Sequence, residues 1–188
     1  MVPVIIICHL EQFLFESEIK KMISSDPDMN AMKDNGELEQ NKEGLIISIT
    51  DKKNLYIFDG STAKLKPYAE SLLSKIADLI KFAPNFIAIS GYTKKTDEDP
   101  LAQYTNWHLS ADRANSARRF LINHGIAPEK VVRISGYADS DPIYPEDPYD
   151  SRNTRISILL FRNSAAPSYK VAITKDLGVI SNSDSGTK

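Results

Sequence analysis

The chain of 188 residues has a single cysteine, Cys8, and three scattered histidines, His9, His108 and His124. One cysteine excludes an internal disulfide, and the histidines lack the spacing of metal ligands. The sequence also contains no phosphate-binding loop, dinucleotide-binding fingerprint or Cys-x-x-Cys pair. It therefore predicts neither a metal ion nor any other cofactor.

The chain also lacks a large excess of positive or of negative charge. The 23 basic and 25 acidic residues leave a formal net charge of −2 at pH 7. Non-specific binding to nucleic acid depends on a basic face that neutralises phosphates, and this balance disfavours it. Charged residues make up 26% and hydrophobic residues 41% of the chain, which are ordinary values for a globular domain. We predict one domain with extensions and no nucleic-acid partner.

The chain has no long hydrophobic run. Residues 2–8 are apolar but are interrupted by Pro3, and a membrane span needs about 20 apolar residues. No basic region precedes this run and no clear small-residue cleavage site follows it, so it is a poor signal peptide. Taken as given, the sequence predicts no membrane anchor, no export signal and a cytoplasmic location.

Runs of apolar and β-branched residues predict strands in the centre of the chain. These runs cover residues 45–49, 55–58, 86–90, 131–137 and 155–161. Before them, residues 1–44 are typical of a helical linker segment, with a helix predicted over residues 11–24. After them, residues 164–188 are polar and rich in serine, which is typical of a loose tail. The folded domain is therefore expected over residues 45–163.

Two helices are predicted between these strands. Residues 67–82 place apolar side chains three and four positions apart, as in an amphipathic helix, and Pro67 suits its first turn. The second helix is predicted to begin at Ser110, a good N-cap, and to stop at His124-Gly125. This order of elements is typical of an α/β two-layer sandwich, in which the helices cover one face of a mixed sheet.

Arg113 is the most informative residue of the second helix. If Ser110 caps the helix, Arg113 falls in the first turn, where the helix dipole and the unpaired backbone N–H groups favour an anion. A guanidinium is electrostatically unfavourable there unless it holds an anion. The residue therefore predicts a pocket for a carboxylate or a phosphate. The alternative is a solvated arginine on an exposed helix face, and spacing alone slightly favours this alternative.

A longer motif surrounds this helix. It consists of Ile89-Ser90-Gly91-Tyr92-Thr93, Asn106-Trp107-His108-Leu109-Ser110-Ala111-Asp112-Arg113-Ala114-Asn115, Arg133-Ile134-Ser135-Gly136 and Asn153-Thr154-Arg155. In this order the segments resemble the OmpA-like peptidoglycan-binding domain, and the second segment is similar to its MotB branch, the flagellar motor stator proteins. The resemblance runs from about Phe15 to Asn163. It leaves open an N-terminally truncated member of the lateral-flagellar type.

The resemblance implies a site for the diaminopimelate side chain of the peptidoglycan stem peptide. This ligand carries both a carboxylate and an ammonium group. Arg113 matches the family arginine that takes the carboxylate, and Asn106 matches the amide of the preceding loop. The other ligand-binding candidates that the resemblance implies are Thr93, Leu109, Ser110, Asn153 and Arg155.

One position departs from the family pattern. The family reads Gly-His/Tyr-Thr-Asp, and its aspartate holds the ammonium, whereas this chain has Gly91-Tyr92-Thr93-Lys94. Like charges at a small pocket cost on the order of 1 kcal/mol or more. We therefore expect weakened muropeptide binding, or none. The alternative is that a nearby acid replaces the aspartate, and the candidates are Asp97, Glu98 and Asp99.

A cell-wall hydrolase is the enzymatic alternative, because His108, Ser110 and Asp112 lie close together in the sequence. Alternating residues at a helix start cannot join their side chains in a catalytic relay, so a helix cap and an exposed acid are the better interpretation. Paired carboxylates for sugar hydrolysis would come from the acidic loops, where solvation is the more common role. We predict no catalytic residue and no enzymatic activity.

The function that the resemblance implies is a non-enzymatic peptidoglycan-binding module derived from a stator protein. Members of that family are anchored in the inner membrane by a proton-conducting helix, place this domain in the periplasm, and in their full-length form bind a MotA-like partner. This chain matches only the periplasmic part and its linker, which favours a truncated and impaired module. A homodimer is expected by resemblance. The alternatives are an interaction or dimerisation module and a remnant without cell-wall binding.

Overall fold

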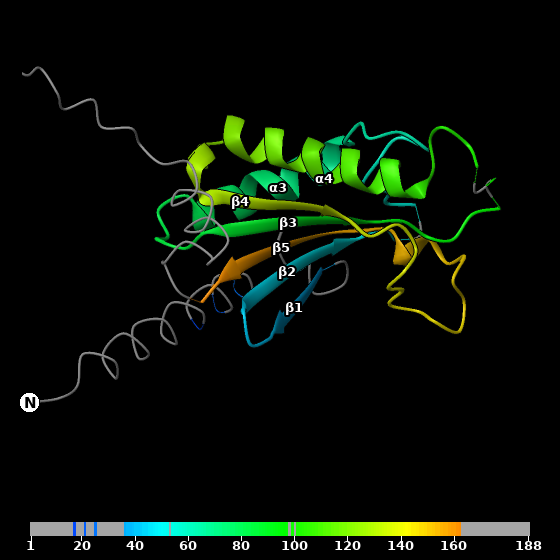
Figure 1. Ribbon diagram of the computed structural model, residues 1–188. Coiled ribbons are helices and arrows are strands. Elements are labelled where there is room, and N and C mark those ends of the chain that lie inside the picture. Colours follow the sequence, from blue (N-terminus) through cyan, green and yellow to red (C-terminus); the bar gives the residue numbers. More distant parts are fainter. Residues whose placement is uncertain are drawn as a thin grey trace, which may run out of the picture.

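The computed structural model describes residues 36–52, 54–97, 99 and 101–162, together with Ser17, Lys21 and Ser25. Within this part of the chain, a mixed five-stranded sheet carries two α-helices on one of its faces (Figure 1). The predicted two-layer α/β sandwich is confirmed. Ser17 and Lys21 are helical, as expected for residues 11–24. The rest of that segment and the predicted tail, residues 164–188, lie outside the described residues.

The strands lie in the order β1-β2-β5-β3-β4. Their bounds are Gly36–Gln40 for β1, Gly44–Thr50 for β2, Ile87–Tyr92 for β3, Val131–Gly136 for β4 and Arg155–Phe161 for β5. β3 and β4 are parallel, and all other neighbours are antiparallel. β5 is last in the sequence but central in the sheet, between β2 and β3. This position explains why β5 is apolar and buried along most of its length.

The helices are α3, Pro67–Ile80, and α4, Asn106–Asn123. Each turns a stripe of small and apolar residues toward the sheet, because burying that stripe removes apolar surface from water. α3 has Pro67 in its first turn, as predicted. The core that the helices and the sheet enclose includes Ile47, Ile49, Leu73, Ile76, Ile89, Leu121 and Ile158.

α4 packs directly onto β3 and β4 because each of these strands has a glycine where the helix crosses it. A Cβ atom on Gly136 would lie 2.6 Å from the backbone nitrogen of Ala111, and one on Gly91 would overlap the carbonyl oxygen of Ser110. Close-packed interiors do not absorb such an overlap without moving the helix. The two glycines therefore fix how closely the first turns of α4 approach the ends of both strands.

Two strand predictions are corrected. β1 lies within residues 1–44, which were predicted to be a helical linker, and it pairs with β2, so the sheet begins before residue 45. The only apolar side chain in β1 is Leu38, which is too little for a recognisable strand pattern. Residues 55–58 form only isolated bridges. Ile57 and Phe58 are buried, so their apolar character reflects core packing and not a strand.

The start of α4 is corrected as well. Thr105 is the N-cap in place of Ser110, and its backbone N–H donates to Nδ1 of His108 at 3.2 Å, in a capping box. The usual sequence signal for a capping box has glutamate or glutamine three residues after the N-cap. Here that residue is His108. Arg113 therefore lies in the third turn of α4. The helix-dipole argument for an anion beside it no longer holds.

Candidate functional site

A cavity of about 660 Å³ lies between the start of α4 and the loops that follow β2 and β3. Its volume is in the range that suits a small ligand. Four charged side chains line it, and they are Asp51, Lys66, Lys94 and Arg113. Aromatic side chains, Tyr56, Phe58 and Tyr104, add apolar surface to the same wall. The cavity therefore offers charges of both signs beside apolar surface.

The structure brings some of the predicted ligand-binding residues together and separates others. Those that line the cavity are Thr93, Asn106, Leu109 and Arg113. Those absent from its lining are Ser110, Asn153 and Arg155. The motif thus contains residues of two kinds, since some form the cavity and others hold the backbone around it.

Arg113 is buried in the cavity wall, and its side chain holds a loop. Its Nε donates to the carbonyl oxygen of Thr62 at 3.0 Å, and its Nη2 donates to that of Gly60 at 2.8 Å. The guanidinium also lies 4.6 Å above the ring centroid of Phe58. Burial lowers the pKa of Arg113, and the negative charge of Asp51 opposes this effect. Arg113 therefore shapes residues 60–62 as well as lining the cavity.

Asn106 also holds a loop. Its Nδ2 donates to Oγ1 of Thr96 at 2.8 Å, which fixes the segment that follows β3. Thr93 differs, because its hydroxyl is buried and has no hydrogen-bond partner among the described residues. An unsatisfied buried hydroxyl costs about 1–3 kcal/mol. Thr93 is therefore a group of the cavity wall that a ligand can satisfy.

Lys94, which stands where the resemblance implies an aspartate, is exposed at the cavity. The acids proposed to replace that aspartate have other partners. Asp97 accepts a hydrogen bond from the Tyr149 hydroxyl at 2.8 Å, and Asp99 accepts one from the backbone of Leu101 at 2.9 Å. Neither lines the cavity. The third candidate, Glu98, lies outside the described residues.

Asp51 is the acidic cavity residue among those that sequence reasoning missed. It directly follows β2, is 7% exposed, and accepts a hydrogen bond from the backbone N–H of Ile57 at 2.7 Å. Burial raises its pKa from 3.8 to about 6, although this hydrogen bond and the charge of Arg113 act in the opposite direction. In the sequence Asp51 reads as a turn residue. The available signal was an acid placed between two buried apolar segments.

Ser110 and Asn153 serve the scaffold. The Ser110 hydroxyl donates to the carbonyl oxygen of Trp107 at 3.1 Å and accepts from the backbone N–H of Ala138 at 3.0 Å. Asn153 accepts from the backbone N–H of Tyr144 at 2.8 Å. Both side chains are almost fully buried. They connect α4 and the loop before β5 to the rest of the domain.

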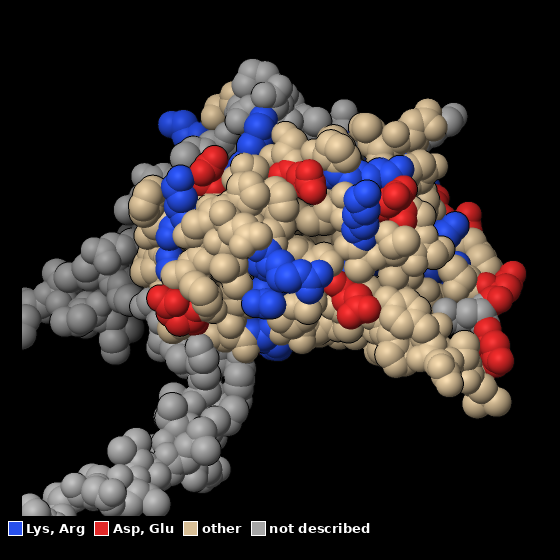
Figure 2. All heavy atoms as spheres, turned by 90° about the horizontal axis from the view of Figure 1, so that it is seen from above, with Lys and Arg blue, Asp and Glu red and all other residues tan. Residues whose placement is uncertain are grey.

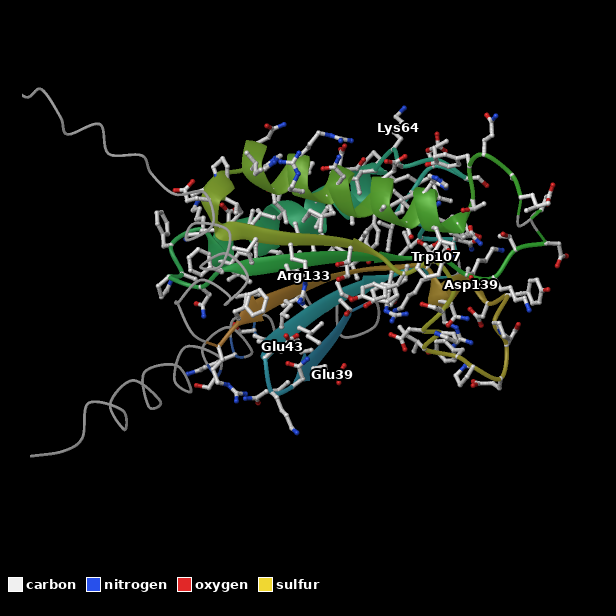
Figure 3. All side chains as sticks on the ribbon, viewed as in Figure 1. Glu39, Glu43, Lys64, Trp107, Arg133 and Asp139 are labelled. Carbon is white, nitrogen blue, oxygen red and sulfur yellow. The ribbon has the colours of Figure 1, made fainter. Side chains whose placement is uncertain are left out.

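Arg155 lies on the face of the sheet that is away from the helices. It donates to the carbonyl oxygen and to Oδ2 of Asp141, both at 2.7 Å, and its guanidinium lies 3.5 Å from the ring centroid of Tyr92. It lines a second depression of about 400 Å³. Arg133 and Glu43 lie on the same face and form an ion pair, with 3.6 Å between Nη2 of Arg133 and Oε2 of Glu43 (Figure 3).

Among the described residues, charges of both signs lie on the side of the molecule that bears the helices (Figure 2). Figure 2 shows lysine and arginine interspersed there with aspartate and glutamate. No group of three or more potential metal ligands occurs within the described residues. In the same part of the chain, none of the helices has the length and apolar character needed to span a membrane.

Comparison with protein families decides which of the known folds this is. The model of the OmpA family matches residues 57–155, a stretch that includes α3, β3, α4, β4 and most of the cavity lining. The chain belongs to the OmpA family. The resemblance inferred from the motif around Arg113 is therefore confirmed.

Within the OmpA family, the chain is similar to Motility protein B of Escherichia coli (strain K12). The two are 36% identical over 152 residues, which cover 79% of this chain and 48% of that protein. A second relative in the same strain, provisionally named truncated flagellar export/assembly protein LafU, is 35% identical over 77% of this chain and 66% of its own length. The chain spans about half the length of the first of these relatives.

Solved structures show the same OmpA-like fold. A protein from Desulfovibrio vulgaris, provisionally described as MotB-like, matches with a TM-score of 0.67 and 22% identity over 83% of this chain and 94% of its own. The periplasmic domain of Helicobacter pylori MotB, residues 97–256, matches with a TM-score of 0.58 and 23% identity over 75% of this chain and 96% of its own.

Proposed function

We propose that this chain is a non-enzymatic peptidoglycan-binding module of the MotB type. Its cavity takes the diaminopimelate side chain of the stem peptide. The observation that carries the proposal is the meeting of Thr93, Asn106, Leu109 and Arg113 around one cavity of about 660 Å³. Thr93 directly follows β3 and the other three residues lie on α4, so their convergence is a property of the fold.

The chemistry of the wall suits a carboxylate. A guanidinium has five N–H donors, and Arg113 uses two of its nitrogens on backbone carbonyls. The remaining donors can bind a carboxylate in a charge-assisted bond. The unpartnered hydroxyl of Thr93 supplies a further donor in the same cavity. Lys66 and Lys94 add positive charge that favours an anionic ligand.

The same positive charge is the reason that we propose impaired binding. Lys94 stands where the family pattern has the aspartate for the ligand ammonium, and like charges repel. A remnant without cell-wall binding, or an interaction module, is the alternative function. The outcome of a binding experiment separates these alternatives from the proposal.

The side chains that could suggest a hydrolase have separate partners. Nδ1 of His108 accepts a hydrogen bond in the helix cap, and Oγ of Ser110 is buried against backbone. Oδ2 of Asp112 accepts a hydrogen bond from the hydroxyl of Tyr104 at 2.8 Å. No relay connects the three residues, which supports a binding role without catalysis.

Binding to peptidoglycan requires the domain to reach the periplasm. The proposed function therefore departs from the cytoplasmic location that the given sequence predicts. The homodimer, the truncation and the association of longer relatives with a MotA-like partner stay predictions. None of them is needed for the cavity to bind a stem peptide.

Sedimentation with insoluble peptidoglycan tests the proposal. We expect the unmodified chain to pellet with the cell wall and Arg113→Ala to bind about tenfold or more weakly, since a charge-assisted bond is lost. Arg119→Ala is the matched control, because Arg119 is exposed on α4 and bonds only Ser116 among the described residues. Lys94→Asp is expected to pellet more completely. An unmodified chain that stays in the supernatant would favour the alternative functions.

A further inference from the structure

Asp51 is held rigidly in the cavity wall. Its backbone N–H donates to the carbonyl oxygen of Thr154 at 3.0 Å, and its Oδ1 accepts from the N–H of Ile57 at 2.7 Å. No described residue donates a hydrogen bond to Oδ2. A fixed carboxylate that lines a cavity and keeps one oxygen for a further partner is an acceptor for a cationic ligand group.

The fold itself does not need the negative charge of Asp51. An asparagine could accept the same hydrogen bond from Ile57 through its own Oδ1. Burial raises the pKa of Asp51 to about 6, so the environment disfavours the charged form. Buried ionisable groups that a scaffold could replace by neutral ones are common at binding sites. The cost of burying the charged Asp51 carboxylate is explained if this charge has a partner in the ligand.

The other charges in the cavity define which ligand fits. Arg113, Lys66 and Lys94 are all positive, and Asp51 is the acid among the lining residues. An anionic ligand gains from the three cations, while a single ammonium group is favourable only beside the carboxylate. The cavity is therefore suited to a zwitterionic end that carries a carboxylate and an ammonium together.

We propose that Asp51 binds the ligand ammonium, in place of the aspartate that this chain lacks at Lys94. Asp51 and Arg113 then hold the two opposite charges of one amino-acid end. The inference rests on the proposed function and adds to it a residue that determines specificity. The inference also changes the expected role of Lys94. Lys94 weakens ligand binding, but the Asp51 carboxylate still accepts the ligand ammonium.

Two peptides separate recognition of the amine from recognition of the carboxylate. The first is L-Ala-γ-D-Glu-meso-diaminopimelate, and the second is the same peptide with the side-chain amine acetylated. Isothermal titration should show that the unmodified chain prefers the free amine by about tenfold or more. Asp51→Asn should bind the free-amine peptide about tenfold to a hundredfold more weakly and the acetylated peptide unchanged. Circular dichroism and thermal melting verify that the variant is folded.

The neighbouring acids supply matched controls. Asp97→Asn and Asp99→Asn remove the same charge outside the cavity, and we expect both variants to bind the two peptides as the unmodified chain does. If Asp51→Asn keeps the preference for the free amine, the inference is wrong while the proposed function stands. A loss in Asp97→Asn or Asp99→Asn would assign the amine to that loop and also overturn it. Failure of the unmodified chain to bind either peptide overturns the proposed function itself.

Discussion

Arg113 shows how one residue can serve both the fold and the site. Its bonds to the carbonyl oxygens of Gly60 and Thr62 hold the loop before α3 against α4. A lysine has a single point of charge and cannot form this forked arrangement. The sequence predicted that the residue holds an anion at a helix start, and this reason is wrong because α4 begins at Asn106. Its place in the cavity follows from tertiary packing.

The free energy of unfolding should depend on pH in part through Asp51, and this part can be measured separately from the contribution of the other acids. Its folded-state pKa, about 6, lies above its ordinary value of 3.8. The folded protein therefore binds this proton more tightly than the unfolded chain does. The stability that Asp51 contributes is fully present below about pH 4 and is lost as pH rises through 6.

Asp51→Asn removes this dependence. We expect the variant to be more stable, relative to the unmodified chain, at pH 7 than at pH 4, by up to ~3 kcal/mol. Urea unfolding of both proteins at the two pH values measures the difference directly, because the other carboxylates cancel between them. A difference that does not change with pH would contradict the raised pKa.

At the scale of elements, the contact of α4 with β3 and β4 positions the cavity. The first turns of the helix carry Asn106 and Leu109 into the wall, and the glycines beneath set the height of these turns above the sheet. In the sequence, Gly91 and Gly136 indicate only the ends of two strands. The structure shows that a glycine is required at each position because α4 crosses there.

Gly91→Ala should therefore destabilise the domain by about 1–3 kcal/mol, since overpacking forces backbone to move. Because the methyl group would meet the backbone of Ser110, we expect weaker peptide binding as well. Thermal denaturation and titration with the free-amine peptide measure both effects. Ser135→Ala, on the neighbouring strand β4, is the control and should change neither by much. Wild-type stability in Gly91→Ala would show that the helix approaches less closely.

At the scale of the whole molecule, β1 covers one edge of the sheet. It pairs along its full length with β2, the strand that leads into Asp51. An uncovered β2 would present unpaired backbone groups at an edge, which promotes association between chains. The predicted boundary at residue 45 would remove this protection.

A chain that starts at residue 45 should consequently be less stable and should associate more than one that starts at residue 36. Light scattering and thermal melting of the two shortened proteins, at equal concentration, provide the measurement. Equal melting temperatures and equal size would mean that β1 contributes nothing to the domain, contrary to its pairing in the sheet.

The sequence by itself determined the elements whose signals are local. Apolar spacing predicted α3, β3, β4 and β5, and the motif around Arg113 identified the family, because periodicity and short motifs are properties of neighbouring residues. The resemblance also predicted Thr93, Asn106 and Leu109 as ligand-binding residues. These are the residues that the fold then gathers around one cavity.

Only the tertiary structure decided the membership of the cavity and the edge of the sheet. Asp51 and Arg113 are far apart in the chain, and they share a wall because β2 and α4 pack into one domain. Ser110 is buried for the same reason, on the face of α4 that packs against the sheet, because the helix starts about one turn before Ser110. β1 exists as a strand because β2 offers it backbone partners. Long-range pairing and packing set these features, and no local pattern carries that information.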